Sequence, residues 1–151
     1  MQIEIERKFL VKGDFLPFAV KKVQIEQGYL FASVERTVRI RIKDKEAFIT
    51  IKGQANGLGF SRAEYEYSIP YCEALEIIKL CETTIKKERY YIPVGKHTFE
   101  VDVFHGAQEG LVIAELELQA ENEIYQKPEW IGEEVTGNKR YYNAWMASNN
   151  V

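Results

Sequence analysis

The stretch QIEIERKFLV (residues 2–11) decides the fold, because its side chains alternate in chemical character with a period of two. Successive side chains of a β-strand point to opposite faces of the sheet. On a strand, Glu4, Glu6 and Lys8 therefore share one face, while apolar residues such as Phe9 lie on the other. The pattern predicts a strand that carries two acids and a base on a single face.

The composition is that of a folded globular protein: 46% of the 151 residues are hydrophobic, 28% are charged, and the net charge is −3. This length predicts a single domain over residues 1–151. The lack of a basic excess argues against a nucleic-acid partner, and the lack of ~20 consecutive apolar residues argues against a membrane span. The acidic start, with no apolar segment, argues against a secretion signal.

The two cysteines, Cys72 and Cys81, lie nine residues apart and form no CxxC motif. Cysteines without a paired spacing are typical of free, buried thiols in a reducing compartment. We therefore expect a cytoplasmic protein without a disulfide.

Alternation with a period of two recurs along the chain and predicts eight strands of an antiparallel sheet that closes on itself, in an α+β protein. These segments are 2–11, 24–31, 35–43, 46–53, 62–69, 86–92, 98–104 and 111–119. The three glycines of residues 52–61 predict a long hairpin loop. Helices are expected over 71–84, over 14–20 with Asp14 as N-cap, and over 138–147.

The polar positions of the predicted strands are mostly full charges, grouped strand by strand. The like-charged pairs at i and i+2 are Arg39/Arg41, Glu64/Glu66, Lys87/Arg89, Glu100/Asp102 and Glu115/Glu117. One interpretation is a half-solvated sheet whose apolar face lies on a core. The repetition favours another: a barrel with charged faces inside and apolar faces covered by helices and loops. A wet lumen of this kind suits a polyanion and a divalent metal ion.

The chain resembles the CYTH superfamily, also called triphosphate tunnel metalloenzymes. Its EIERKF segment (4–9) matches the ExExK signature, and VRIRI (38–42), SRAEYEYSIP (61–70), KERYYI (87–92), FEVDVFHG (99–106) and GLVIAELEL (110–118) match in order. The later segments are most similar to the compact bacterial subgroup associated with inorganic triphosphatase activity. The resemblance implies a closed eight-stranded antiparallel β-barrel, a tunnel with a charged lumen, flanked by a few helices.

The resemblance also implies roles for individual residues. The metal ligands, for Mg²⁺ or Mn²⁺, fall on Glu4, Glu6, Glu115 and Glu117. The phosphate-binding cations fall on Lys8, Arg39, Arg41, Lys52, Lys87, Arg89 and Arg140. Glu64, Glu66, Glu100 and Asp102 match tunnel acids that hold metal, orient water or balance the basic wall. Tyr29 is similar to a tyrosine near the tunnel, although a packing role fits it equally well.

The implied activity is metal-dependent hydrolysis of inorganic triphosphate to pyrophosphate and phosphate. The alternatives are a class IV-type adenylyl cyclase, a nucleoside or thiamine triphosphatase, and a non-catalytic polyphosphate-binding module. We expect a triphosphate-containing small molecule as substrate and allow for a homodimer. The C-terminal helix either plugs one end of the tunnel or covers the apolar outside of the barrel. Asn138 stands where the family usually has Asp, and either residue can cap the following helix.

Overall fold

The computed structural model describes residues 2–149, with side chains up to residue 147. Within these residues the strands are β1 (Gln2–Val11), β2 (Lys21–Ala32), β3 (Arg36–Lys43), β4 (Glu46–Gly53), β5 (Ser61–Ile69), β6 (Thr84–Val94), β7 (His97–Phe104), β8 (Val112–Glu117) and β9 (Ile131–Glu134). The helices are α1 (Tyr71–Ile77) and α2 (Asn143–Asn149). Single 3₁₀ turns are η1 (Leu16–Phe18), η2 (Ile78–Leu80), η3 (Gly106–Gln108) and η4 (Lys139–Tyr141).

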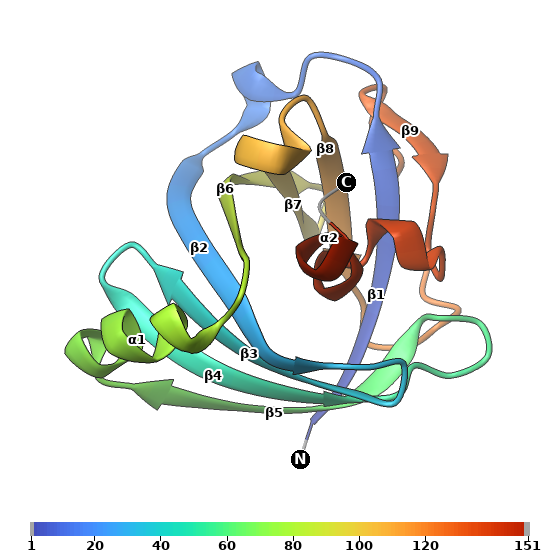
Figure 1. Ribbon diagram of the computed structural model, residues 1–151. Helices are drawn as coiled ribbons and strands as arrows, with labels where there is room; N and C mark the ends of the chain where they lie inside the picture. The colour runs from blue at the N-terminus through green and yellow to red at the C-terminus, as the bar shows by residue number, and fades with distance from the viewer. Residues whose placement is uncertain (1, 150–151) are drawn as a thin grey trace.

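The strands form one antiparallel sheet that closes into a barrel (Figure 1). Its order is β5-β4-β3-β2-β6-β7-β8-β1, and pairing of β1 with β5 closes the circle. The first strand makes the closure because its two halves have different partners: Gln2–Ile5 pair with β5, and Glu6–Leu10 pair with β8. The predicted eight-stranded barrel is confirmed, and β9 adds a short extra strand beside β1.

The barrel carries its charges inside and its apolar residues outside. In β1, Lys8 faces the lumen, while Phe9 is fully buried on the outer side among Phe99 and Trp130. The turn η1, the segment before β9 and β9 itself cover this side of the barrel. On the opposite side, α1 and η2 cover β3 and β4, where Ala74 packs against Ile40. The inverted arrangement expected from the sequence is therefore confirmed.

The C-terminal helix α2 lies across one end of the lumen (Figure 1). Its Met146 and Ala147 pack against Ile85, Phe104 and Ile113. Each of these three side chains lies two residues from a charged lumen residue of β6, β7 or β8, so it shares the face that points into the barrel. The helix therefore plugs one end of the lumen and does not cover the outer surface.

The local expectations differ from the structure in several places. The helix expected over 138–147 is divided into the turn η4 and the helix α2, with Tyr142 between them. The segment 14–20 forms only the turn η1, and Asp14 Oδ1 accepts a hydrogen bond from the Leu16 amide at 3.2 Å. The helix expected over 71–84 ends at Ile77, with η2 extending it to Leu80, because β6 begins at Thr84. Of the two free cysteines, Cys81 is buried as expected but Cys72 is exposed. No helix in the described part of the chain is long and apolar enough to cross a membrane.

Candidate active site

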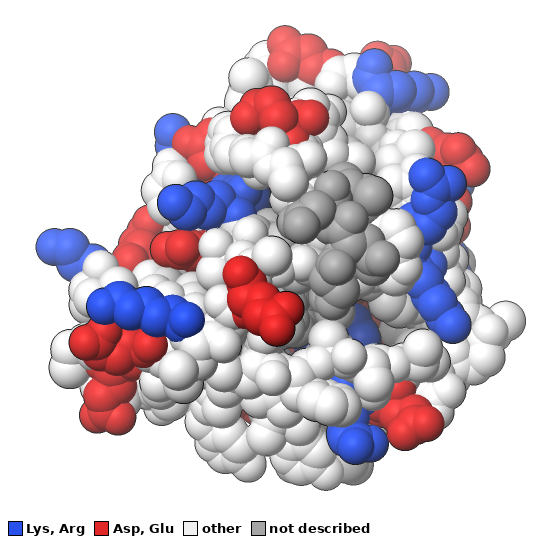
Figure 2. Space-filling view, viewed as in Figure 1, with Lys and Arg blue, Asp and Glu red and all other residues white. Residues whose placement is uncertain are grey.

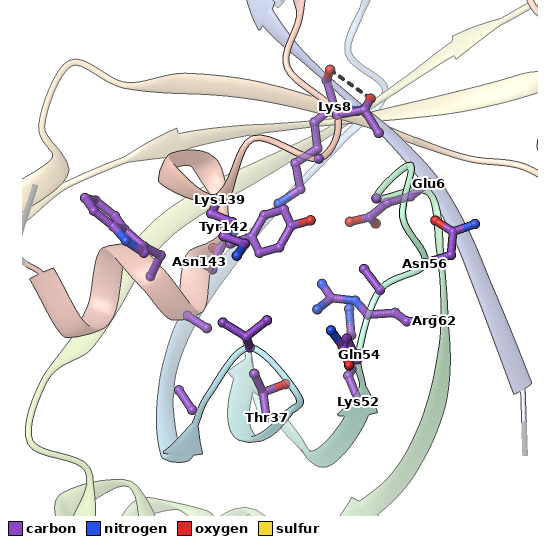
Figure 3. A pocket seen from close by; sticks show the side chains of 18 of the residues that line it. Glu6, Lys8, Thr37, Lys52, Gln54, Asn56, Arg62, Lys139, Tyr142 and Asn143 are labelled. Atoms are coloured by element: carbon purple, nitrogen blue, oxygen red, sulfur yellow. Dashed lines mark hydrogen bonds between the residues drawn. The ribbon is translucent and has the colours of Figure 1, made fainter.

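A cavity of about 790 Å³ opens into the barrel between the β2–β3 hairpin, the β4–β5 loop and the C-terminal segment (Figure 3). Its charged lining residues are the cations Lys8, Arg39, Arg41, Lys52, Arg62 and Lys139 and the acids Glu6 and Glu115. By contrast, basic and acidic residues are interspersed over the outer face drawn in Figure 2. The cavity therefore holds an excess of positive charge that suits a small polyanion.

Strand β3 positions the first part of this basic wall, because Arg39 and Arg41 alternate with apolar residues that face α1. Arg39 Nη2 donates to Thr50 Oγ1 at 3.1 Å and lies 3.6 Å from Glu66 Oε2. Arg41 Nε donates to Gln27 Oε1 at 2.8 Å and makes no ion pair with a described carboxylate. Burial lowers the pKa of Arg41 to about 10, and neighbouring guanidinium groups add to the effect. Arg41 is thus a charged group whose outer nitrogens are available to an anion.

Lys52 and Arg62 extend the wall from β4 and β5, and both lie beside Glu4. Lys52 Nζ is 2.8 Å from a Glu4 carboxylate oxygen and 3.6 Å from Glu64, while Arg62 Nε is 3.5 Å from Glu4. Burial would raise the pKa of Glu4, but Lys52 and Arg62 outweigh it and hold the value at about 2. Glu4 is therefore an ionised acid whose charge the wall already balances.

Lys87, Arg89 and Asp102 form a buried network behind the cavity lining. Arg89 donates from Nε and Nη2 to the two oxygens of Asp102 at 2.7 and 2.9 Å, and also contacts Glu100 at 3.1 Å. Lys87 Nζ lies 2.7 Å from Asp102. Burial lowers the pKa of Lys87 to about 7 despite Asp102. Burial opposes ionisation of Asp102 as well, but Arg89 and Lys87 hold its pKa at about 2.

Glu6, Glu115 and Glu117 lie together on β1 and β8, where Glu6 is opposite Glu117 in the strand pairing. Burial raises the pKa of Glu6, and the nearby Glu115 and Glu4 raise it further. Burial also raises the pKa of Glu117, again with Glu4 adding to it. Burial opposes ionisation of Glu115, but Lys8 and Arg89 hold its pKa well below the usual value.

The expected metal ligands fit a hard divalent cation by donor type, since carboxylate oxygens are the ligands that Mg²⁺ and Mn²⁺ prefer. The mutual repulsion that raises the pKa of Glu6 is also the kind of strain that a divalent cation relieves. As the side chains stand, however, no three His, Cys, Asp or Glu residues of the described chain converge closely enough to hold a metal ion. Glu4 points toward Lys52, so the ligand set requires a side-chain rotation to assemble.

The structure brings most of the sequence-predicted residues to one place. Those in the cavity lining are Glu6, Lys8, Tyr29, Arg39, Arg41, Lys52 and Glu115. Those joined to it by ion pairs or hydrogen bonds are Glu4, Glu64, Glu66, Lys87, Arg89, Glu100 and Asp102. Glu117 is exposed at the end of β8, as Glu66 is on β5. Arg140 is exposed and outside the lining, where Lys139 stands in its place.

Sequence reasoning missed Arg62, Gln27 and Asn143. Arg62 shares its strand face with Glu64, so the period-two pattern contains the signal for it. Gln27 likewise shares its strand face with Tyr29, but a lone glutamine does not stand out among charged pairs. Asn143 has no local signal, because its contacts are to strands far away in the sequence.

Comparisons with known proteins agree with this geometry. The family model described as CYTH domain matches residues 2–144. An inorganic triphosphatase of Acetivibrio thermocellus is 47% identical over 148 residues, covering 97% of this chain and 94% of that protein. An inorganic triphosphatase of Nitrosomonas europaea is 37% identical over 150 residues, covering 95% and 96%. The crystal structure of the inorganic triphosphatase NE1496 superposes with a TM-score of 0.65 at 33% identity, covering 95% of this chain and 97% of that one. The chain belongs to the CYTH domain family.

Proposed function

We propose that this protein hydrolyses inorganic triphosphate to pyrophosphate and phosphate inside the barrel, with the help of a divalent cation. The observation that carries the proposal is the cavity itself, where six cationic side chains surround Glu6 and Glu115. The 47% and 37% identical relatives, both named inorganic triphosphatases, support the same activity.

In this proposal the basic wall binds and orients the substrate. Arg41 presents its outer guanidinium nitrogens to phosphate oxygens, and Lys8 and Lys52 add point charges from neighbouring strands. Phosphoryl transfer needs little covalent chemistry from the protein, so positioning and charge neutralisation provide most of the rate enhancement. Water attacks one terminal phosphorus, the P–O bond to the bridging oxygen breaks, and pyrophosphate leaves.

The cation, which we propose is Mg²⁺ or Mn²⁺, would be held by Glu4, Glu6, Glu115 and Glu117. When bound, it supplies neutralisation of phosphate charge and lowers the pKa of water. The acids Glu64, Glu66, Glu100 and Asp102 would balance the basic wall, as their ion pairs suggest. We further propose a single domain over residues 1–151, a cytoplasmic location and no nucleic-acid or membrane partner, and we leave both a monomer and a homodimer open.

A phosphate-release assay tests the proposal directly. The panel contains triphosphate, ATP, thiamine triphosphate and pyrophosphate, each with Mg²⁺, with Mn²⁺ and with a chelator. We expect triphosphate to be hydrolysed much faster than ATP, and we expect no turnover with chelator. Pyrophosphate should be hydrolysed very slowly, because it leaves part of the basic wall unpaired. Turnover of ATP or thiamine triphosphate above triphosphate would replace the proposal with an organic triphosphatase, and cyclic AMP as product would replace it with a cyclase.

Matched arginine variants on β3 test the site. Arg41→Gln removes a lining cation, while Arg36→Gln removes an exposed one that pairs with the exposed Glu35 and lies over the Phe31 ring. We expect kcat/KM for triphosphate to fall by about 10²-fold in the first, by analogy with the loss of one preorganised charge stabiliser, and to stay unchanged in the second. Equal activity in both variants would place the reaction elsewhere. Binding of triphosphate without turnover by the wild-type protein would identify a binding module.

A further inference from the structure

Asn143 begins the plug helix α2 and lines the cavity beside Tyr142 (Figure 3). Its Oδ1 accepts a hydrogen bond from Lys87 Nζ at 2.8 Å and another from Gln27 Nε2 at 3.1 Å. Gln27 presents its Oε1 to Arg41, whose guanidinium is a donor only, so Gln27 Nε2 donates to Asn143 and the Asn143 amide must present its oxygen. The orientation of the Asn143 side chain is thereby fixed by chemistry.

Gln27 connects Asn143 to Arg41 on the opposite side of the basic wall. Its side chain is fully buried, and its Oε1 accepts the hydrogen bond from Arg41 Nε at 2.8 Å. Its Nε2 also contacts the Tyr29 hydroxyl at 3.4 Å. Arg41, Gln27, Asn143 and Lys87 therefore form one hydrogen-bonded chain across β3, β2, α2 and β6. A shift of Asn143 would displace two cations at once.

The plug helix also has contacts that do not involve Asn143. Met146 and Ala147 anchor it through apolar contacts, and Asn138 accepts a hydrogen bond from the Arg140 amide at the preceding turn. The side-chain nitrogen of Asn143, Nδ2, makes no hydrogen bond to another described residue, although the side chain lines the cavity. Its oxygen is engaged twice, and its two N–H donors are left for a ligand.

We propose that Asn143 is a positioning residue of the triphosphate site: its carboxamide oxygen holds Lys87 directly and Arg41 through Gln27, and its side-chain nitrogen donates to a phosphate oxygen. This inference rests on the proposed function, since it assigns a new residue to the same anion site. It also gives α2 a part in the site besides closing the lumen: the helix carries a neutral donor to a wall otherwise made of cations.

Three variants separate the two parts of this role. Asn143→Ala removes the oxygen and the amide donor. Asn143→Asp keeps an oxygen for Lys87 and Gln27 but replaces the donor with a carboxylate oxygen that repels a polyanion. Asn138→Ala is the matched control, because it removes an exposed asparagine of the same C-terminal segment whose own side chain does not line the cavity. Each protein is assayed for kcat/KM with triphosphate and for the rise in Tm that triphosphate causes.

We expect Asn143→Ala to lower kcat/KM by about 10- to 100-fold, the factor typical of lost hydrogen bonds to charged groups. Asn143→Asp should keep the Tm of the free protein, since its oxygens still hold Lys87, yet lose at least as much kcat/KM and most of the triphosphate-induced rise in Tm. Asn138→Ala should keep both ligand readouts. The contrast between a stable fold and a lost ligand response distinguishes positioning from a purely structural role.

Wild-type activity and ligand response in Asn143→Asp would overturn the donor role, and an Asn143→Ala enzyme as active as Asn138→Ala would overturn the whole inference. The rise in Tm reports binding without turnover. If wild-type protein binds triphosphate but does not hydrolyse it, the proposed function fails, while the binding series still decides the role of Asn143.

Discussion

Replacing Asp102 with asparagine tests the buried network behind the basic wall. Asp102 and Lys87 have side chains with 0% exposure, and Asp102 is also the acceptor of two hydrogen bonds from Arg89. An asparagine of the same size keeps the packing but leaves both cations without their shared counter-charge. Breaking a buried pair by removing one partner typically destabilises a protein by about 3–5 kcal/mol.

Two features of the network place the expected loss near the lower end of that range. Arg89 keeps contacts to Glu100 at 3.1 Å and to Glu115 at 3.5 Å, and Lys87 can release its proton. We therefore expect Asp102→Asn to lower the free energy of unfolding by about 3 kcal/mol at pH 6. Because small domains are stable by only about 5–15 kcal/mol, urea denaturation followed by circular dichroism resolves such a loss easily.

The pH dependence of this loss has a defined sign. Asp102 has a pKa lowered from its ordinary value of 3.8 to about 2, so its stabilising contribution is present above pH 3.8 and disappears as the pH falls toward 2. In the wild type, Lys87 is charged and pairs with Asp102 only below its pKa of about 7, and the loss of Asp102 in the variant lowers this pKa further. The difference between wild type and variant should therefore be largest between about pH 4 and 7.

Asp14→Asn is the matched control, since Asp14 is exposed and accepts only the Leu16 amide. We expect it to change the free energy of unfolding by less than about 0.5 kcal/mol, as surface substitutions usually do. If Asp102→Asn at pH 6 lies within about 1 kcal/mol of Asp14→Asn, the network is not a buried counter-charge system and the reasoning is refuted.

Two further predictions use other features of the barrel. Triphosphate binding near pH 8 should take up a proton, because Lys87 with its pKa of about 7 is mostly neutral there and a polyanion favours its charged form. Calorimetry in buffers of different ionisation enthalpy measures the proton uptake, and Lys87→Met should abolish it. Gly28→Ala should destabilise the fold by about 1–3 kcal/mol without changing KM, because an added Cβ would lie 2.8 Å from Cys81 on the outside of the barrel. The control is Gly57→Ala, whose added Cβ meets nothing within 4 Å, and equal free energies of unfolding for the two variants would contradict the close contact at Gly28.

The barrel could be predicted from the sequence because the alternating pattern is a local property of each strand. Lys8 and Phe9 are neighbours in sequence, and the strand geometry alone sends one into the lumen and the other into the outer core. Strand β9 escaped detection because it is only four residues long and includes Gly132, which lies close to the Leu10 carbonyl. The helix over 71–84 was predicted too long because residues 81–83 form a connection and Thr84 already pairs in β6.

The site was predictable where charge repeats along a strand and unpredictable where it depends on contacts between distant segments. Arg39 and Arg41 share a strand face, so period-two reading groups them. The hydrogen bond of Asn143 to Gln27 joins residues 116 positions apart, and that to Lys87 joins residues 56 apart. Such contacts depend on where α2 docks, and this position cannot be predicted from the sequence of α2 alone. Arg140 shows the converse: a basic residue beside Tyr141 matched the family pattern, but the turn η4 directs it outward.

Acids and cations of the lumen form ion pairs that neutralise their charges. The nitrogen–oxygen distance is 2.8 Å between Lys52 and Glu4 and 2.7 Å between Arg89 and Asp102. A buried charge deprived of its partner is costly, so a bare polyanion that drew the cations away would leave the acids uncompensated. A divalent cation that drew the acids away would do the same to the cations. A triphosphate together with a divalent cation carries both signs and can compensate both sets at once. We therefore expect Mg²⁺ and triphosphate each to raise the affinity for the other by the same factor, as linkage requires. Titration of triphosphate at several Mg²⁺ concentrations, corrected for the complex formed in solution, measures this factor. A value of one would show that the acids do not respond to the anion.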